Sequence, residues 1–91
     1  MSNNFIHARE YLHSGDAVIV DCSHRCNIRL TDDSNFNRFR RLEQHTYYGG
    51  FFDRFPARIS VPRTGYWNVT LDLGGGSANI RYNIRYYKQA A

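Results

Sequence analysis

Two cysteines close to one histidine are the first residues of this chain that could support chemistry. Cys22 and Cys26 are separated by three residues, and His24 lies between them. A structural zinc site needs about four ligands, commonly in paired Cys-x-x-Cys units, so this spacing does not indicate a metal. Three more histidines could supply ligands, but their spacing in the sequence does not indicate that they join such a site: His7, His13 and His45. We predict no metal site and no cofactor, and a reversible disulfide across the turn is the alternative role for the thiols.

Cysteine catalysis would require a thiolate held beside a base. Cys22 and His45 have suitable residue types, but almost any domain with two cysteines and four histidines would offer such a pair. The residue types alone therefore do not indicate a nucleophile.

The other candidates for catalysis are incomplete motifs. The segment 74–77 is Gly-Gly-Gly-Ser, but it lacks the lysine and the following helix of a phosphate-binding loop. Asp32 and Asp33 lie in a turn-like cluster, where aspartate commonly bonds the local backbone. No acid/base pair of the kind used in glycoside hydrolysis is evident. We expect no catalytic residues and a protein that is not an enzyme.

An aromatic segment beside a glycine pair is the best candidate for binding. The chain has eleven arginines against a single lysine, with a net charge of +4. Arginine can grip a carboxylate or phosphate and stack on a ring, and glycines let a ligand approach the backbone. The predicted ligand-binding residues are His45, Tyr47, Tyr48, Gly49, Gly50 and Arg58. The alternative is structural: a tyrosine packs inside, the glycines form a bulge, and the arginines lie on solvated strand faces.

Length and hydropathy limit what can position these residues. Ninety-one residues suit one domain, 1–91. The longest fully apolar run is Ala17–Val20, far short of the ~20 residues that cross a bilayer. The first residues do not resemble a secretory signal. We expect no membrane partner and a cytoplasmic location.

Frequent glycine and proline divide the chain into strand-length pieces. Phe5–Leu12 and Ala57–Val61 are predicted strands, the second near an edge. Ala17–Thr31 is interpreted as a hairpin whose first strand, Ala17–Cys22, is central because it is apolar on both faces. His45–Phe52 is expected to form a strand, a turn or bulge at the glycine pair, and a second short strand.

The most regular alternation lies near the C-terminus. Trp67, Val69 and Leu71 share one face of Tyr66–Leu73, and the polar residues share the other. This strand and the alternating segment 80–87 are interpreted as a terminal hairpin. Its polar face is expected to be a cross-strand ladder in which Asp72 faces an arginine, or else a binding face or dimer contact.

One helix is expected within Asp32–Glu43, where Phe36, Phe39 and Leu42 are spaced by three. Asp33 or Ser34 could cap it, and an irregular loop is the alternative. The predicted fold class is all-β: a small antiparallel β-sandwich or partly open barrel of six to eight strands with at most one short helix.

The segment from Val20 to Ile84 resembles the bacterial domain-of-unknown-function family 1883. The matching stretches include Val20–His24, Asn27–Phe36, Tyr47–Gly50, Phe55–Ile59, Val61-Pro62, Gly65–Val69 and Leu71–Gly75. The resemblance implies an all-β, sandwich-like fold and supplies no established activity. Members are sometimes joined to a Toll/interleukin-1 receptor-type domain, which implies a sensing or interaction role in bacterial signalling or defence. These 91 residues contain no such second domain.

These observations lead to a functional hypothesis. We expect a non-enzymatic binding or sensor module that recognises a small anionic ligand or a protein partner. A nucleic-acid-binding domain is one alternative, because interleaved aromatic and basic residues bind nucleic acids. The other is a structural protein that forms homo-oligomers through its sheet.

Overall fold

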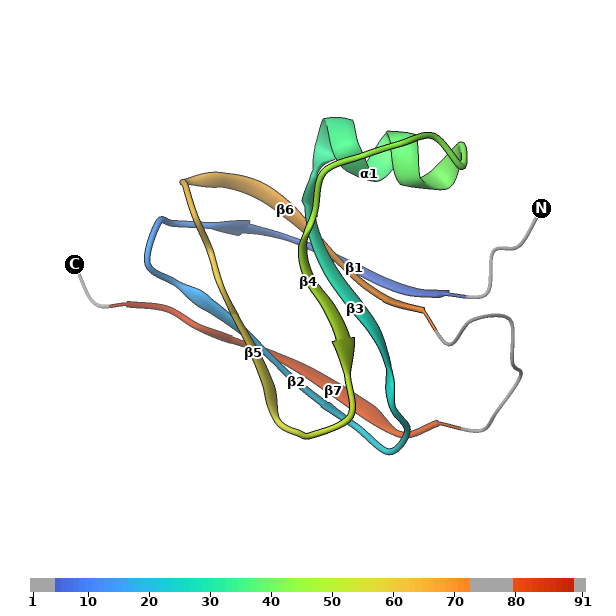
Figure 1. Ribbon diagram of the computed structural model, residues 1–91. Coiled ribbons are helices and arrows are strands. Elements are labelled where there is room, and N and C mark those ends of the chain that lie inside the picture. Colours follow the sequence, from blue (N-terminus) through green and yellow to red (C-terminus); the bar gives the residue numbers. More distant parts are fainter. Residues whose placement is uncertain (1–4, 73–79, 90–91) are drawn as a thin grey trace.

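The computed structural model describes residues 5–72 and 80–89, which form seven strands and one short helix (Figure 1). The elements are β1 (Phe5–Leu12), β2 (Ala17–Cys22), β3 (Cys26–Asp32), α1 (Asp33–Arg40), β4 (Tyr48–Phe52), β5 (Ala57–Ser60), β6 (Gly65–Asp72) and β7 (Tyr82–Tyr87). The predicted all-β fold class and the single short helix are confirmed.

The strands form two antiparallel sheets that face each other as a small sandwich (Figure 1). The larger sheet has the order β1-β6-β3-β4, and the smaller has the order β5-β2-β7. β2 is the central strand of its sheet and β5 is an edge strand, as predicted. The two sheets do not close into a barrel.

The core lies between the sheets and follows the period-2 alternation of the strands. β2 contributes Val18 and Val20, and β6 contributes Trp67, Val69 and Leu71, all nearly or fully buried. Trp67 is 1% exposed, and its indole Nε1 donates a hydrogen bond to the carbonyl of Arg63 at 2.9 Å. Leu73, the last residue of the predicted strand, lies outside the described residues.

Both predicted hairpins are wrong. The strands β2 and β3 belong to different sheets, and so do β6 and β7. The segment between Cys22 and Cys26 is therefore an arch that crosses the sandwich. Alternation shows which side chains point inward, but a strand and its successor can face each other across a core as well as pair side by side.

The expected salt-bridge ladder of the terminal hairpin is lost with that hairpin. Asp72 does meet an arginine, but the partner is Arg29 of β3, at 3.5 Å. Arg85 of β7 instead contacts Asp21 of β2 at 3.4 Å.

The glycine pair also differs from the prediction, since it interrupts no strand. Gly49 and Gly50 lie inside β4 with φ of +109° and +150°. They pair with Arg29 and Ile28 of β3. Residues with positive φ can remain in the ladder here because glycine has no Cβ.

The helix α1 begins at an aspartate cap, one residue before the predicted positions. The Asp32 carboxylate accepts hydrogen bonds from the backbone N–H of Asn35 at 2.9 Å and from its side-chain amide. The left-handed residue Leu42, with φ of +61°, follows the last turn. The helix packs against β3 and β6 and so covers part of the outer face of the larger sheet (Figure 1).

Candidate functional site

The outer face of the larger sheet beneath α1 carries polar side chains in ordered rows. The strand register places His7, Thr70, Arg29 and Gly49 opposite one another across β1, β6, β3 and β4. Phe36 of α1 stacks on His7, with ring centroids 4.1 Å apart and planes 14° apart. We call this surface the helix-covered face, and its outward polar residues are His7, Arg9, Arg29, Thr31, Asn68 and Thr70.

At one side of the helix-covered face, two basic side chains each lie close to the same two aromatic rings. The Arg29 guanidinium carbon lies 5.5 Å from the Phe39 ring centroid and 5.1 Å from that of Tyr47. The His45 ring lies 5.4 Å from Phe39 and 5.5 Å from Tyr47. The four residues come from β3, the last turn of α1 and the segment before β4, and we call them the Arg29 cluster.

Four buried polar atoms in this region have no hydrogen-bond partner among residues 5–72 and 80–89: Arg29 Nε, His45 Nε2, Thr31 Oγ1 and Thr70 Oγ1. Arg29 and Thr70 are directly opposite in the register. Buried polar groups in folded proteins are nearly always paired, so each exception requires an explanation. Here the exceptions gather on the helix-covered face.

On the opposite side of the same face, both oxygens of the Asp33 carboxylate have hydrogen-bond partners. Asp33 accepts two hydrogen bonds from Arg9, at 3.0 and 2.7 Å, and one from the Asn68 amide at 2.8 Å. These contacts, the Arg9 bonds first and the Asn68 bond second, lower the pKa of the Asp33 carboxyl to about 2. Asn68 also donates to the Thr31 carbonyl and bonds the ring of His7. This side therefore offers little to a ligand.

Arg29 is held less tightly than Arg9. Its Nη1 lies 3.5 Å from an Asp72 oxygen, whereas charge-assisted N–H···O bonds are usually about 2.7–2.9 Å long. The Arg29 side chain is 19% exposed. The guanidinium therefore keeps a positive charge and an unused Nε–H in a shielded position.

The tautomer of His45 follows from its backbone contact. His45 Nδ1 lies 3.0 Å from the Glu43 carbonyl oxygen, which can only accept, so Nδ1 carries a proton. The other ring nitrogen, Nε2, is buried and has no hydrogen-bond partner among the described residues. A group that accepts a hydrogen bond from Arg29 Nε and forms one with His45 Nε2 suits this arrangement.

Half of the sequence-predicted site residues lie in or next to this cluster. His45 and Tyr47 belong to it, and Gly49 is the strand partner of Arg29. Tyr48 turns the other way and meets the edge of the Trp67 ring, with centroids 6.0 Å apart. Gly50 is the partner of Ile28.

Arg58 is not part of this group. It alternates with buried Ala57 and Ile59, so it points outward from the smaller sheet, where it lies 5.6 Å from the Tyr87 ring centroid. The structure places Arg29, instead of Arg58, beside Tyr47.

Sequence reasoning missed Arg29 because the contact depends on strand pairing. The alternation of β3 indicates that Arg29 faces outward, opposite to Ile28 and Leu30. Nothing in that pattern shows that β4 lies alongside or that Phe39 covers the same position.

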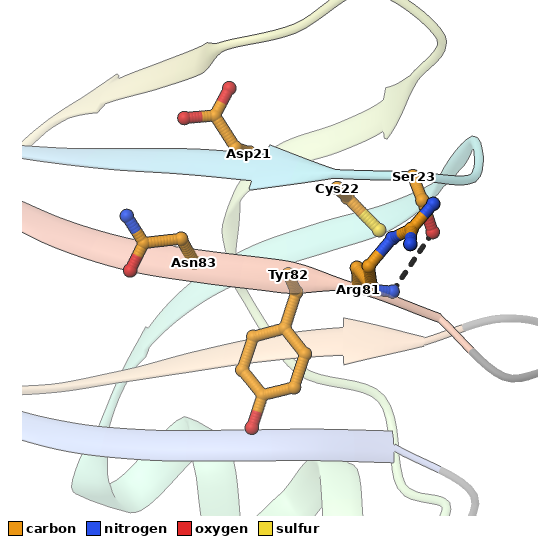
Figure 2. Close-up of a pocket in the computed structure, with 6 residues that line it drawn as sticks. All are labelled: Asp21, Cys22, Ser23, Arg81, Tyr82 and Asn83. Carbon is orange, nitrogen blue, oxygen red and sulfur yellow. Dashed lines mark hydrogen bonds between the residues drawn. The ribbon is translucent and has the colours of Figure 1, made fainter.

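A concave feature lies at the end of the smaller sheet (Figure 2). It is a shallow pocket of about 330 Å³ lined by Asp21, Cys22 and Ser23 from one chain segment and by Arg81, Tyr82 and Asn83 from another. Ser23 Oγ accepts a hydrogen bond from the Arg81 backbone N–H at 2.9 Å.

No group of three or more potential metal ligands occurs within residues 5–72 and 80–89. Within the same ranges there is no helix of the length and apolarity that a bilayer crossing requires.

Comparison with known proteins identifies a family but no characterised relative. No curated protein and no solved structure matches the chain significantly. One family model, described as Domain of unknown function (DUF1883), matches residues 3–90 and thus nearly the whole chain. The protein therefore belongs to the DUF1883 family.

Proposed function

We propose that this protein is a non-enzymatic binding module for a small anionic ligand, and that the Arg29 cluster is its site. The observation that supports the proposal is the pair of shielded nitrogen atoms, Arg29 Nε and His45 Nε2, that lack partners among the described residues within one aromatic cluster. A bacterial signalling or defence context and a cytoplasmic location are part of the same proposal.

The energetics favour an anion. Leaving a buried polar group unpaired costs about 1–3 kcal/mol, and more when the group is charged. A carboxylate or phosphate oxygen at Arg29 would form a charge-assisted hydrogen bond, which is roughly twice as strong as a neutral one. The hydroxyls of Thr31 and Thr70, which are also unpartnered among the described residues, add two donors on the same face.

The aromatic side chains shape the site and its entrance. Phe39 and Tyr47 both contact the two basic groups and lower the local dielectric, which strengthens charge interactions. Tyr47 is 42% exposed, so rotation of its side chain would open a path to Arg29.

A thermal-shift screen with phosphate, pyrophosphate, nucleotides and di- and tricarboxylates tests the proposal. A ligand that binds only the folded state raises Tm with its concentration. We expect at least one anion class to stabilise the wild type, and Arg29→Met to abolish that shift.

Arg58→Met is the matched control, because Arg58 also lies over a tyrosine ring but on the other sheet. It should leave the shift unchanged. Equal loss in both variants, or no shift with any anion, would contradict an Arg29 site.

A nucleic-acid-binding role is the second candidate, and one observation favours it. Six arginines form no ion pair with a carboxylate among the described residues: Arg25, Arg38, Arg40, Arg54, Arg58 and Arg81. Binding to single-stranded DNA that weakens steeply with salt, and that survives Arg29→Met, would favour this candidate over the first.

A further inference from the structure

The two cysteines approach each other across the sandwich. Cys22 ends β2 in the smaller sheet, and Cys26 begins β3 in the larger one. Their sulfur atoms are 4.0 Å apart, and both are thiols. The arch between them has only three residues, all exposed. A sulfur–sulfur bond of about 2.05 Å therefore requires a local shift of about 2 Å at two strand ends.

The two thiols have different surroundings. Cys22 is half-buried: it packs against the core and also lines the pocket of Figure 2. Cys26 is 2% exposed and belongs to the core. Burial, followed by the neighbouring Cys22, raises the pKa of the Cys26 thiol to about 12. Cys26 is therefore protonated and inert toward solvent oxidants, while Cys22 is more exposed.

The pocket that Cys22 lines also contains one cation and one carboxylate. Arg81 lines the same pocket and makes no ion pair with a carboxylate of the described residues. The pocket also contains Asp21, but that carboxylate faces Arg85 at 3.4 Å. The thiolate is the form of cysteine that reacts with peroxides and disulfides.

We propose that Cys22 and Cys26 form a reversible disulfide, with a hydroperoxide as oxidant, in which Cys22 reacts first and Cys26 resolves. The Cys22 thiolate attacks one peroxide oxygen. The O–O bond breaks, and the departing alkoxide or hydroxide takes up a proton, which leaves a sulfenic acid on Cys22. Cys26 Sγ then attacks the Cys22 sulfur, and the displaced hydroxide leaves as water with the Cys26 proton.

The balance of the two steps is complete. Two thiols and one hydroperoxide give one disulfide, one alcohol and one water, and the two electrons come from the thiols. Two thiol–disulfide exchanges with a dithiol reductant reverse the reaction.

The bond would change the pocket and the sandwich together. It would draw the Cys22 sulfur away from the pocket and toward the core. It would also join the two sheets covalently at the end where the arch crosses, so the oxidised protein should have the higher Tm. The oxidation state is thereby coupled to the shape of the pocket.

Hydrogen peroxide titration of the full chain tests the proposal. We expect loss of both thiols per chain, a mass lower by two hydrogen atoms, and a peptide map that joins Cys22 to Cys26. Dithiothreitol should restore both thiols. Intermolecular dimers, or two thiols that react no faster than free glutathione, would overturn the proposal.

Which cysteine reacts first is tested with Cys22→Ser and Cys26→Ser, after circular dichroism has shown that each variant folds. In Cys26→Ser, Cys22 should accumulate as a sulfenic acid that dimedone traps. In Cys22→Ser, Cys26 should react at least about tenfold more slowly than Cys22 does. Equal rates for the two single thiols would refute the assignment. If neither serine variant folds, the assignment rests on dimedone trapping in the wild type, where an adduct at Cys26 would refute it.

Discussion

The outer faces of the two sheets carry similar side chains in different surroundings. On the smaller sheet, Arg85 pairs with Asp21, and both side chains are about half exposed, at 51% and 50%. On the larger sheet, Arg29 pairs with Asp72, and the Arg29 side chain is only 19% exposed. The difference comes from α1, which packs over β3 and β6. The smaller sheet has no such covering element among the described residues, and we call its outer surface the open face.

This comparison shows that a covering helix can turn an ordinary polar strand face into a site. On the open face, water satisfies whatever the protein does not, and the effective dielectric is high. Beneath α1, each polar atom must find a partner or remain unpaired at a cost. Unpaired donors are therefore informative on the helix-covered face and uninformative on the open face.

The largest expected effect is the loss of the covering side chain itself. Phe36 is 8% exposed and stacks on His7, so Phe36→Ala should lower the free energy of unfolding by about 3 kcal/mol. Tyr87→Ala on the open face, where the ring is 53% exposed, should cost less than about 1 kcal/mol. Urea denaturation followed by Trp67 fluorescence measures both. Similar losses of stability in the two variants would mean that α1 does not shield the helix-covered face more than the open face is shielded.

The second expected effect is at the side of the sandwich where β4 and β5, edge strands of the two sheets, contact each other. A Cβ at Gly49 would overlap the carbonyl oxygen of Ile28 and lie 3.0 Å from Ile59 Cδ1 of the opposite sheet. Together with the φ of +109°, this predicts a loss of about 2 kcal/mol for Gly49→Ala. Gly50→Ala meets nothing within 4 Å and should cost less. A reversed order in chemical denaturation would show that backbone strain at Gly50 outweighs the contact at Gly49.

Patterns of one strand or one helix were predictable from the sequence, and pairing between strands was not. The alternation around Trp67 and Val69 correctly indicates which side chains enter the core. The same alternation is compatible with either sheet as a destination, so both hairpins were predicted wrongly. The helix was predictable from its phenylalanine spacing. Its N-cap residue was not, because several adjacent residues can cap a helix, and the residue that does so is Asp32 and not Asp33 or Ser34.

In the candidate site too, residues that are close in sequence were predictable, and the residue that depends on strand pairing was not. His45 and Tyr47 are close in sequence, and a local aromatic run was enough to select them. Arg29 reaches them through the pairing of β3 with β4, and Arg58 is removed from them because β5 joins the other sheet. A site built from three elements needs the topology before its central residue can be recognised.

The third expected effect is a loss of stability in acid that is specific to the helix-covered face. The pKa of Asp33 is about 2 when folded, below the ordinary 3.8. A lowered folded pKa contributes stability above the ordinary value, and this contribution is lost as the pH falls from about 4 to about 2. Because the Arg9–Asp33 pair is about half exposed, solvent screening limits the contribution to about 1 kcal/mol. Asp33→Asn should flatten the unfolding free energy over that pH range.

Asp21→Asn is the matched variant on the open face, since Asp21 also faces an arginine. Its acid profile should follow the wild type more closely than that of Asp33→Asn. If the free energy of unfolding had the same pH dependence in both variants, the acid sensitivity would not be specific to the helix-covered face.

The smallest expected effect concerns Arg29. Removing a buried cation normally destabilises a protein when its partner is left uncompensated. Arg29→Met, however, also removes an Nε that is unpaired among the described residues, and Asp72, whose side chain is 29% exposed, remains in contact with water. The loss of the ion pair with Asp72 destabilises the protein, whereas the removal of the unpaired Nε stabilises it. We therefore expect a change of less than about 0.5 kcal/mol in the free energy of unfolding. A loss above about 2 kcal/mol would mean that Arg29 is held by structural contacts. The Arg29 charge would then have a structural role, and this result would contradict the proposed anion site.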